Sequence, residues 1–491
     1  MQRKVTTMPN VLDHSKPYFR FFEEISAIPR NSGDERAVSD YIVEFARERG
    51  LRHRRDAINN VVIEKDASPG FEDEAPVILQ GHTDMVCVKK EGVEHDFTRE
   101  PLKLRIVDGW LRADGTSLGA DDACGVAAML YILDDATLEH PALECVFTVE
   151  EESGMGGAAQ FDYTSLRGRR MVGLDAKDEA ECLVATAGGR RFTLTREWAA
   201  QQTSGTVVTL SVSGLVGGHP GVEIHKGGAN AIKVVARILD SLRAEGVRIR
   251  LAQFDGGDSG NAIPGASRAV FVAEGASQDD VRSLLAAAAE AQTGQRSATD
   301  PDMLIEFAIE EQSREVMSEA ESDELCAAIL LIPSGVLQMS PTFAGAVQTS
   351  CNLAAVHAEG GATSIIVSTR SSVEAQLDDA VSDVVRIARL FGFDSEAGPS
   401  HPALSFRPVS PFRDQYAEAM RELWGKDIDM LAAHAGVELG YFAANLPGLE
   451  TVALGPYITG AHTFDEAMEV ASFERVCLFL AGFLRRLQDA R

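Results

Sequence analysis

The hydrophobic pattern of the first 190 residues alternates between helix-like and strand-like segments. Residues 34–50 carry apolar side chains three and four positions apart and end at a glycine, which predicts an amphipathic helix with a glycine stop. Short apolar runs at 77–81, 142–149 and 170–174 predict buried strands, and the apolar segment 124–136 predicts a buried helix. Strands that alternate with helices indicate a largely parallel, doubly wound α/β sheet.

The pattern changes after about residue 188. Apolar and polar side chains alternate with period two at 206–215, and a helical pattern follows at 228–246. Further strand and helix patterns continue from there. From about residue 400 the first pattern returns, with a buried strand predicted at 450–456 and a helix at 473–487.

These changes of pattern predict two domains, one of which is discontinuous. Residues 1–188 and 400–491 are expected to form an α/β body. Residues 189–399 are expected to form an inserted α+β domain whose sheet has one open face.

The composition narrows the class of protein. With 491 residues and 45% hydrophobic content, the chain can bury more than one core. The 74 acidic and 46 basic residues give a net charge of −28, which argues against a nucleic-acid partner. Seven cysteines without C-x-x-C spacing argue against a disulfide framework. We find no signal peptide and no membrane-spanning run, so we expect a cytoplasmic protein without a membrane partner.

Histidines and carboxylates follow the predicted strands of the body. Ligands of open α/β sheets bind just beyond the carboxyl ends of the strands, so these side chains are expected to share one edge. A further pair of aspartates opens the helix at about residue 122, in a glycine-rich loop. The complete set is His82, Asp84, Asp121, Asp122, Glu150, Glu151, Glu152, Asp175 and His462.

So many carboxylates at one edge would repel one another unless a cation lay among them. Two histidines with several carboxylates suit Zn²⁺, Mn²⁺ or Co²⁺ and are too rich in nitrogen for Ca²⁺. Two metal ions about 3.5–4 Å apart, sharing a bridging carboxylate, would use more of these groups than one ion. Each residue alone has an ordinary explanation, such as a helix cap or a solvated turn, but their joint placement favours a metal site.

Motifs of other hydrolases are incomplete. The segment 256–261, GGDSGN, resembles the surroundings of a serine-protease nucleophile, but no accompanying histidine motif is present. The glycines at 154–157 are not followed by the Gly-Lys-Ser/Thr of a phosphate-binding loop.

A set of motifs resembles the M20-type metallopeptidases and, more narrowly, the cytosolic aminoacyl-histidine dipeptidases, also called Xaa-His dipeptidases, beta-alanyl-histidine dipeptidases or peptidase D. The resemblance runs from about residue 15 to the C-terminus. It implies a zinc-peptidase-like catalytic body with an inserted lid and dimerisation domain, and hence a homodimer. The motifs, in order, are GHTDMVC, DGTSLGADD, TVEEESGMGGA, GLDA, GLVGGHPGVEIHKGGANAIK, NAIP, HAGVELG and GPYITGAHTFDE.

The resemblance implies a metal-ligand set. His82 and Asp175 would hold one ion, and Glu152 and His462 would hold the other. Asp121 would bridge the two. Two divalent ions are implied, with Zn²⁺ ahead of Mn²⁺ and Co²⁺.

The resemblance also implies two residues that support the reaction. Asp84 would orient His82 through its other ring nitrogen. Glu151 would act as the general base, taking a proton from the attacking water and returning it to the leaving amine. The peptide bond between Asp121 and Asp122 is implied to be cis.

Four further residues are implied to contact the substrate. His219 would stabilise the oxyanion of the tetrahedral intermediate in a partner subunit, and Arg370 would bind the substrate carboxylate. Asn261 would be another contact from the lid. Glu438 is a candidate partner for the free amino group.

The chain departs from the family pattern at two positions. A basic residue commonly precedes the NAIP motif, and Gly260 stands there instead, which affects one lid contact and the substrate preference. The residue after the bridging aspartate is often Asn and is Asp122 here, which adds a carboxylate.

We therefore expect a two-metal dipeptidase that cleaves Xaa-His dipeptides, including beta-alanyl-histidine. Another M20 activity is the first alternative: a tripeptidase, an N-acyl amino-acid hydrolase or a carboxypeptidase. The second is a non-catalytic metal- or peptide-binding protein, which would have no use for a base such as Glu151 beside its ligands.

Overall fold

The computed structural model describes residues 10–258 and 260–488. Contacts divide these residues into two compact units, each with its own principal sheet. Unit 1 is discontinuous and contains the described residues up to Val184, then Phe406–Leu431, then the described residues from Val437 onward.

Unit 2 contains Ala185–Ser405 and the short segment Ala432–Gly436. The hydrophobic pattern gives no sign that this short segment belongs to unit 2. A backbone hydrogen bond of 3.1 Å from Ala187 to the carbonyl of Ala433 is one of the contacts that place it there.

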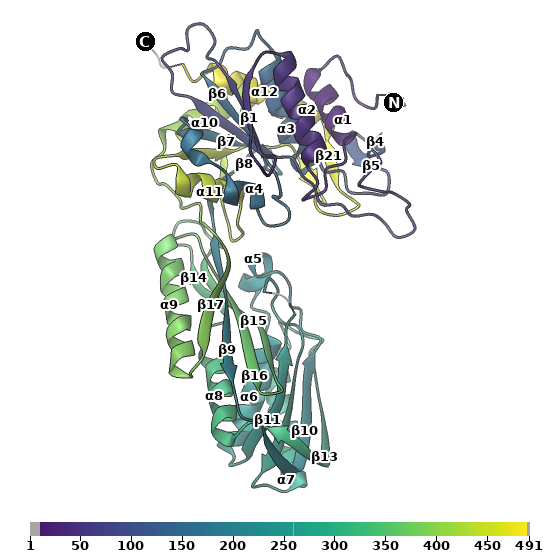
Figure 1. Cartoon of the computed structure of the whole chain (residues 1–491), viewed down its shortest axis with the longest axis vertical. Helices are drawn as coiled ribbons and strands as arrows, with labels where there is room; N and C mark the ends of the chain where they lie inside the picture. Colours follow the sequence, from purple (N-terminus) through teal and green to yellow (C-terminus); the bar gives the residue numbers. More distant parts are fainter. Residues whose placement is uncertain (1–9, 259, 489–491) are drawn as a thin grey trace. The chain divides into compact units, whose positions relative to one another are not determined.

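A six-stranded sheet forms the centre of unit 1 (Figure 1). Four neighbouring strands are parallel, and an antiparallel pair extends one edge. This arrangement confirms the predicted α/β body with a largely parallel sheet. In sheet order the strands are β1 (Arg52–Arg55), β2 (Val61–Lys65), β6 (Leu143–Thr148), β3 (Val77–His82), β7 (Arg170–Gly173) and β19 (Glu450–Ala453).

Helices surround this sheet because their apolar faces need a buried partner. The central strands β3 and β6 are buried along their whole length, as expected of parallel strands covered on both faces. The helix α3 packs against β3, and α10 packs against β19. The helices of unit 1 are α1 (Pro17–Ser26), α2 (Arg36–Glu48), α3 (Ala120–Asp134), α4 (Gly156–Gln160), α10 (Pro411–Trp424), α11 (Glu438–Asn445) and α12 (Val470–Arg485).

Short strands form two further sheets, one of two strands and one of four. They are β8 (Glu181–Thr186) with β18 (Asp429–Ala433), and β20 (Ile458–Thr459), β21 (Ala467–Glu469), β5 (Trp110–Ala113) and β4 (Leu104–Val107).

Unit 2 is built on a nine-stranded antiparallel sheet (Figure 1). Pairing of β11 with β15 joins its two four-stranded halves, and β14 adds to β15. In sheet order the strands are β13 (Leu304–Val316), β10 (Gln201–Ser213), β12 (Ser267–Glu274), β11 (Arg248–Gly256), β15 (Val347–Glu359), β16 (Ala362–Ser371), β9 (Gly188–Glu197) and β17 (Asp394–His401), with β14 at Gly335–Met339.

Four helices contribute to one buried apolar cluster with alternate residues of the unit 2 sheet, so they cover a single face of it. This placement explains the period-two pattern of the strands, since only one face of each strand meets the helices. Among the described residues, a small apolar cluster around Val207 and Val272 lies on the opposite face. The four helices are α6 (Ala231–Ala244), α7 (Gln278–Arg296), α8 (Glu319–Leu331) and α9 (Glu374–Leu390), and the short α5 spans Pro220–Glu223.

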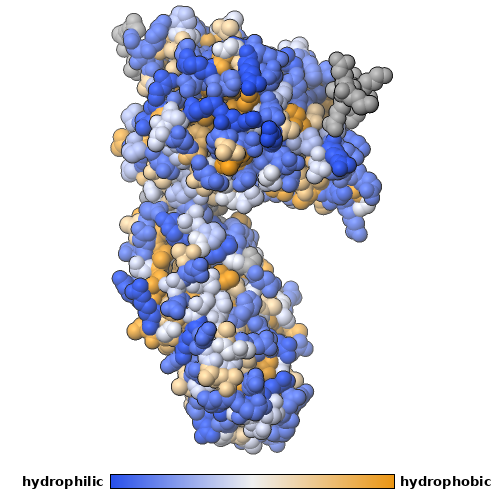
Figure 2. Space-filling view, in the orientation of Figure 1, coloured by the Kyte–Doolittle hydropathy of each residue, from blue (hydrophilic) through white to orange (hydrophobic). Residues whose placement is uncertain are grey.

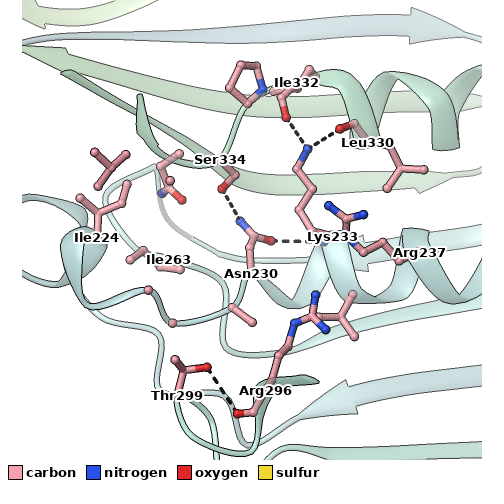
Figure 3. A pocket seen from close by; sticks show the side chains of 18 of the residues that line it. Ile224, Asn230, Lys233, Arg237, Ile263, Arg296, Thr299, Leu330, Ile332 and Ser334 are labelled. Atoms are coloured by element: carbon pink, nitrogen blue, oxygen red, sulfur yellow. Dashed lines mark hydrogen bonds between the residues drawn. The ribbon is translucent and has the colours of Figure 1, made fainter. Parts of the chain in front are cut away.

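A cavity of about 730 Å³ lies beside α6 and the end of α8 (Figure 3). The Lys233 ammonium reaches across it and donates to the carbonyls of Ile329 at 2.5 Å, Leu330 at 2.9 Å and Ile332. Carbonyls at a helix end have no partner within the helix, so Lys233 supplies one. Asn230 caps α6 beside Lys233 and donates to Ser334 (Figure 3). The polar groups of this cavity therefore serve the packing of unit 2.

The visible surface is mostly hydrophilic, with small apolar patches separated by polar side chains (Figure 2). Among the described helices, none combines the length and apolar character that a membrane crossing requires.

Replacement of Lys233 by methionine is predicted to destabilise unit 2. It removes the donor to three carbonyls at the end of α8, and a buried carbonyl without a partner costs about 1–3 kcal/mol. Urea unfolding of the full chain measures this loss. Lys226→Met is the control, since Lys226 is exposed and should change stability by no more than about 0.5 kcal/mol. Equal stability of both variants would contradict the helix-end role of Lys233.

Candidate metal centre

The strand ends of the unit 1 sheet bring the predicted ligands together. His82 is the last residue of β3, and Asp84 follows it by two positions. Glu152 lies in the turn after β6, and Asp175 follows β7. The carboxyl ends of parallel strands share one edge of the sheet, so the fold itself gathers these side chains.

Asp121 lies at the centre of the group. One of its carboxylate oxygens is 3.1 Å from His82 Nε2, and the other is 3.1 Å from His462 Nε2. His462 Nε2 is also 3.0 Å from Glu152 Oε1. One ligand atom from each of His82, Asp121 and Glu152 lies within 4.8 Å of the others, which is a spacing that one metal ion can span. Each oxygen of Asp121 thus faces a different histidine, as a bridging carboxylate would.

Asp175 lies on the His82 side of this group. Its Oδ1 atom is 3.9 Å from His82 Nε2. The side chain of Lys177 enters between two carboxylates, with Nζ at 2.7 Å from Asp121 and in contact with Asp175. Sequence reasoning did not single out Lys177, although it stands two residues after the GLDA aspartate. Its ammonium group shows that this space attracts positive charge.

The donor set fits divalent metal ions. His82 is 1% exposed and Asp121 is 4% exposed, so their polar atoms have almost no access to water. The buried Oε1 atom of Glu152 and the Nδ1 atom of His82 make no well-aligned hydrogen bond among the described residues, although each lies close to an oppositely charged group. Imidazole nitrogens and carboxylate oxygens at this spacing are the ligands that Zn²⁺ and similar ions take.

Asp84 ties the His82 turn to the loop after β6. Its carboxylate lies 3.3 Å from His82 Nδ1 and accepts hydrogen bonds of 3.1 Å from the backbone N–H groups of Glu151 and Glu152. Ser32 donates a further hydrogen bond of 2.7 Å. Burial alone would raise the pKa of Asp84, but the contact with His82 outweighs it and lowers this pKa to about 2. Asp84 therefore stays anionic and holds the orientation of His82.

Two more carboxyl groups lie beside the predicted ligands. Burial raises the pKa of Glu151 well above its ordinary value, with the charges of nearby carboxylates adding to the effect. Burial likewise raises the pKa of Glu438 to about 7. Gln80 and Thr148 each donate to Glu438 Oε2 at 2.6 Å, whereas the buried Oε1 has no partner among the described residues. Burial therefore favours the protonated form of both carboxyl groups more than water would.

Two buried residues that sequence reasoning missed hold the loop before α3. Glu466 accepts backbone hydrogen bonds from Leu118 and Gly119 at 2.8 Å and from Ala120 at 2.9 Å. Arg30 donates to the carbonyls of Asp84 at 3.0 Å and Gly119 at 2.6 Å. The motif GAHTFDE contains Glu466 and was the available signal, whereas nothing in the pattern marked Arg30.

This loop delivers Asp121 in an unusual backbone conformation. The peptide bond between Asp121 and Asp122 is cis, as the family resemblance implies. Both residues depart from helical dihedral angles at the start of α3. Asp122 is fully buried, and burial raises the pKa of its carboxyl group well above the ordinary value.

The other predicted site residues lie in unit 2 and contact one another there. Arg370, 7% exposed, donates to Asn261 Oδ1 at 2.7 Å and to the carbonyl of His434 at 3.3 Å. His219 contacts Asn261, and burial together with the Arg370 charge lowers the pKa of His219. His434 is also buried, and its Nε2 lies 2.7 Å from Ser350 Oγ. The group therefore combines one guanidinium with neutral imidazoles.

Comparison of the sequence with known proteins shows which family the chain is related to. The model of the peptidase family M20/M25/M40 matches residues 78–486. The chain is 32% identical to the cytosol non-specific dipeptidase of Escherichia coli over 476 residues, which are 96% of this chain and 98% of that protein.

Solved structures of peptidases are similar to this structure. The aminoacylhistidine dipeptidase of Vibrio alginolyticus superposes with a TM-score of 0.87 at 30% identity, covering 95% of this chain and 96% of that one. The aminopeptidase PepT of Bacillus cereus has the same fold, with a TM-score of 0.56 at 15% identity, covering 97% of this chain and 99% of that one. The family model spans most of the chain and the E. coli relative is matched along nearly its whole length, so the chain belongs to the M20 family and is a hydrolase that acts on peptide bonds.

Proposed function

We propose that the protein is a metal-dependent dipeptidase that hydrolyses Xaa-His dipeptides, including beta-alanyl-histidine. The observation that carries the proposal is the placement of Asp121 between His82 and His462, with Glu152 and Asp175 beside them. Two relatives matched along nearly their whole length are named as dipeptidases, and the name of one specifies aminoacylhistidine.

His82 and Asp175 would hold one divalent ion and Glu152 and His462 the second, with Asp121 shared between the two. Such ions would lower the pKa of the attacking water and polarise the peptide carbonyl. We propose Zn²⁺ ahead of Mn²⁺ and Co²⁺. In this proposal residues 1–188 and 400–491 form the catalytic domain.

Glu151 is the proposed general base. Its raised pKa suits a carboxylate that must take up a proton from the attacking water and then give it to the leaving amine. Asp84 fixes the backbone of Glu151 and the ring of His82 at the same time, so it positions the base relative to a ligand. Glu438, with one buried oxygen lacking a partner among the described residues, is the proposed contact for the substrate amino group.

Residues 189–399 form the proposed lid and dimerisation domain. Arg370 binds the substrate carboxylate, with Asn261 holding its guanidinium, and His219 donates to the oxyanion of the tetrahedral intermediate. The protein is proposed to be a homodimer through this domain, and His219 of each protomer serves the site of the other.

A cytoplasmic location completes the proposal. All seven cysteines are free, which suits a reducing compartment, and the E. coli relative is named a cytosol dipeptidase.

Removal of the metal ions is predicted to abolish hydrolysis. After treatment with a chelator and dialysis, a panel of Xaa-His and non-His dipeptides should show no turnover, and Zn²⁺, Mn²⁺ or Co²⁺ should restore it. Full activity of metal-free protein would contradict the proposal. Restored hydrolysis of tripeptides or N-acyl amino acids, without hydrolysis of dipeptides, would point to another M20 activity.

Glu151→Gln is predicted to keep both metal ions and to lose turnover by about 10²–10⁴-fold or more, because the side chain can no longer accept a proton. Initial rates and elemental analysis are measured on the same sample. Glu150→Gln is the matched control from the same turn and should keep near-parent activity. A Glu151→Gln protein as active as the parent would refute the assignment of the base.

Co-expression of two inactive variants tests the proposed exchange of His219 between protomers. If Glu151→Gln and His219→Ala form mixed dimers, one site in each mixed dimer has an intact base and an intact partner histidine. A random mixture should then recover about a quarter of wild-type activity, since half of the dimers are mixed and half of their sites are intact. No recovery, with mixed dimers shown by differential tags, would mean that His219 acts within its own chain.

A further inference from the structure

Two arginines on neighbouring strands of unit 2 share the face of the sheet that is opposite to the helices. Arg370 on β16 pairs with Gly189 on β9, and Arg191 lies two residues beyond Gly189. Side chains two apart in a strand point to the same face, so Arg191 and Arg370 are diagonal neighbours. Phe192 and Leu194 alternate with them and are buried in the helix-covered core.

Neither guanidinium is neutralised by a carboxylate in the part of the chain that the structure describes. Arg370 donates to the amide oxygen of Asn261 and to the carbonyl of His434, both of which are neutral. Burial, with the charge of Arg191 adding to it, lowers the pKa of Arg370 to about 10, and no acidic group among the described residues opposes this effect. Buried positive charge without a counter-charge is costly, so this group is suited to bind an anion.

The two histidines near Arg370, His401 and His434, are uncharged at neutral pH. Burial and the nearby Arg370 lower the pKa values of His401 and His434 to about 4, so both rings are neutral at neutral pH. One ring nitrogen of each, Nδ1, is buried without a hydrogen-bond partner among the described residues. Neutral donors and acceptors therefore surround a pair of cations.

Gly260 makes room for Arg191. A Cβ atom added at Gly260 would lie 2.4 Å from Nε and 2.6 Å from Cζ of Arg191, which is too close for the guanidinium to stay in place. The backbone of Gly260 is not in the left-handed region, so another residue would be tolerated there if Arg191 moved. The Nε atom of Arg191 is buried and has no hydrogen-bond partner among the described residues.

We infer that Arg191 is a specificity-determining residue that binds a second carboxylate of the substrate beside the one held by Arg370, so that dipeptides ending in Asp or Glu are cleaved as well as Xaa-His. This inference rests on the proposed function, in which Arg370 holds the α-carboxylate. A guanidinium offers a rigid fork of donors that matches a carboxylate, and two adjacent forks match a substrate with two carboxylates.

A role for Arg191 in binding would also explain why glycine, and not a basic residue, stands at position 260. The resemblance places a positive charge just before the NAIP motif. Here Arg191 on β9 supplies a positive charge at that point, and the absence of a side chain at Gly260 leaves room for it. The position of the Arg191 guanidinium therefore depends on the absence of a side chain at residue 260. A change at either residue should weaken binding of the second carboxylate.

The test compares hydrolysis of Ala-Glu with that of Ala-His at pH 8, where the substrate imidazole is neutral. Arg191→Met should lower kcat/KM for Ala-Glu by roughly tenfold or more, the effect of losing one charge-assisted contact, and should change that for Ala-His by less than about threefold. The loss should appear mainly in KM. Gly260→Ala should shift the ratio in the same direction because its methyl group displaces Arg191, and Arg191→Lys should keep part of the Ala-Glu activity.

Arg314→Met is the matched control, since Arg314 is an exposed arginine of the same sheet, on β13, and should leave the ratio unchanged. Circular dichroism checks that each variant folds. An Ala-Glu to Ala-His ratio that is unaltered in both Arg191→Met and Gly260→Ala, or an equal loss on both substrates, would overturn the inference. Wild-type protein that cleaves neither dipeptide would instead refute the proposed function.

Discussion

The repulsion among buried carboxylates at the edge of the unit 1 sheet is the constraint on which the site depends. Asp121 lies between two histidines, with the carboxylates of Glu152 and Asp175 close by, and it is only 4% exposed. Water cannot screen these charges, so positive charge has to be supplied from within the site. Lys177 supplies some of it at Asp121 and Asp175. Divalent ions would supply the rest, and the fold is arranged to hold their ligands.

The scaffold around the ligands explains why they stay together despite this repulsion. Asp84 joins the turn after β3 to the turn after β6, and Glu466 and Arg30 fix the loop that carries Asp121. These contacts are made to backbone groups and not to the metal-ligand side chains. They therefore hold the loops whatever the charge on the ligand carboxylates. Hydrogen bonds to the residues that carry the ligands fix the orientation of the ligands, and this orientation affects the strength of metal binding.

Much of this site could be predicted from the sequence because its residues lie directly after strands. The apolar runs before His82, Glu152 and Asp175 predict parallel strands, and parallel strands place the residues after their carboxyl ends at one edge of the sheet. Arg30 and Lys177 could not be predicted this way, since their roles arise from contacts across the fold and not from a periodic pattern. Likewise, only the structure shows that Gly260 lies against the side chain of Arg191, because the two residues are 69 positions apart in the chain (260 minus 191).

We propose that Asp121 is shared by two metal ions. Anomalous diffraction from crystals of the zinc-loaded protein, measured on both sides of the zinc absorption edge, tests it most directly. We expect two peaks about 3.5–4 Å apart, one on each side of the Asp121 carboxylate. A single peak away from Asp121, or two peaks that do not contact it, would show that Asp121 is not shared by two ions.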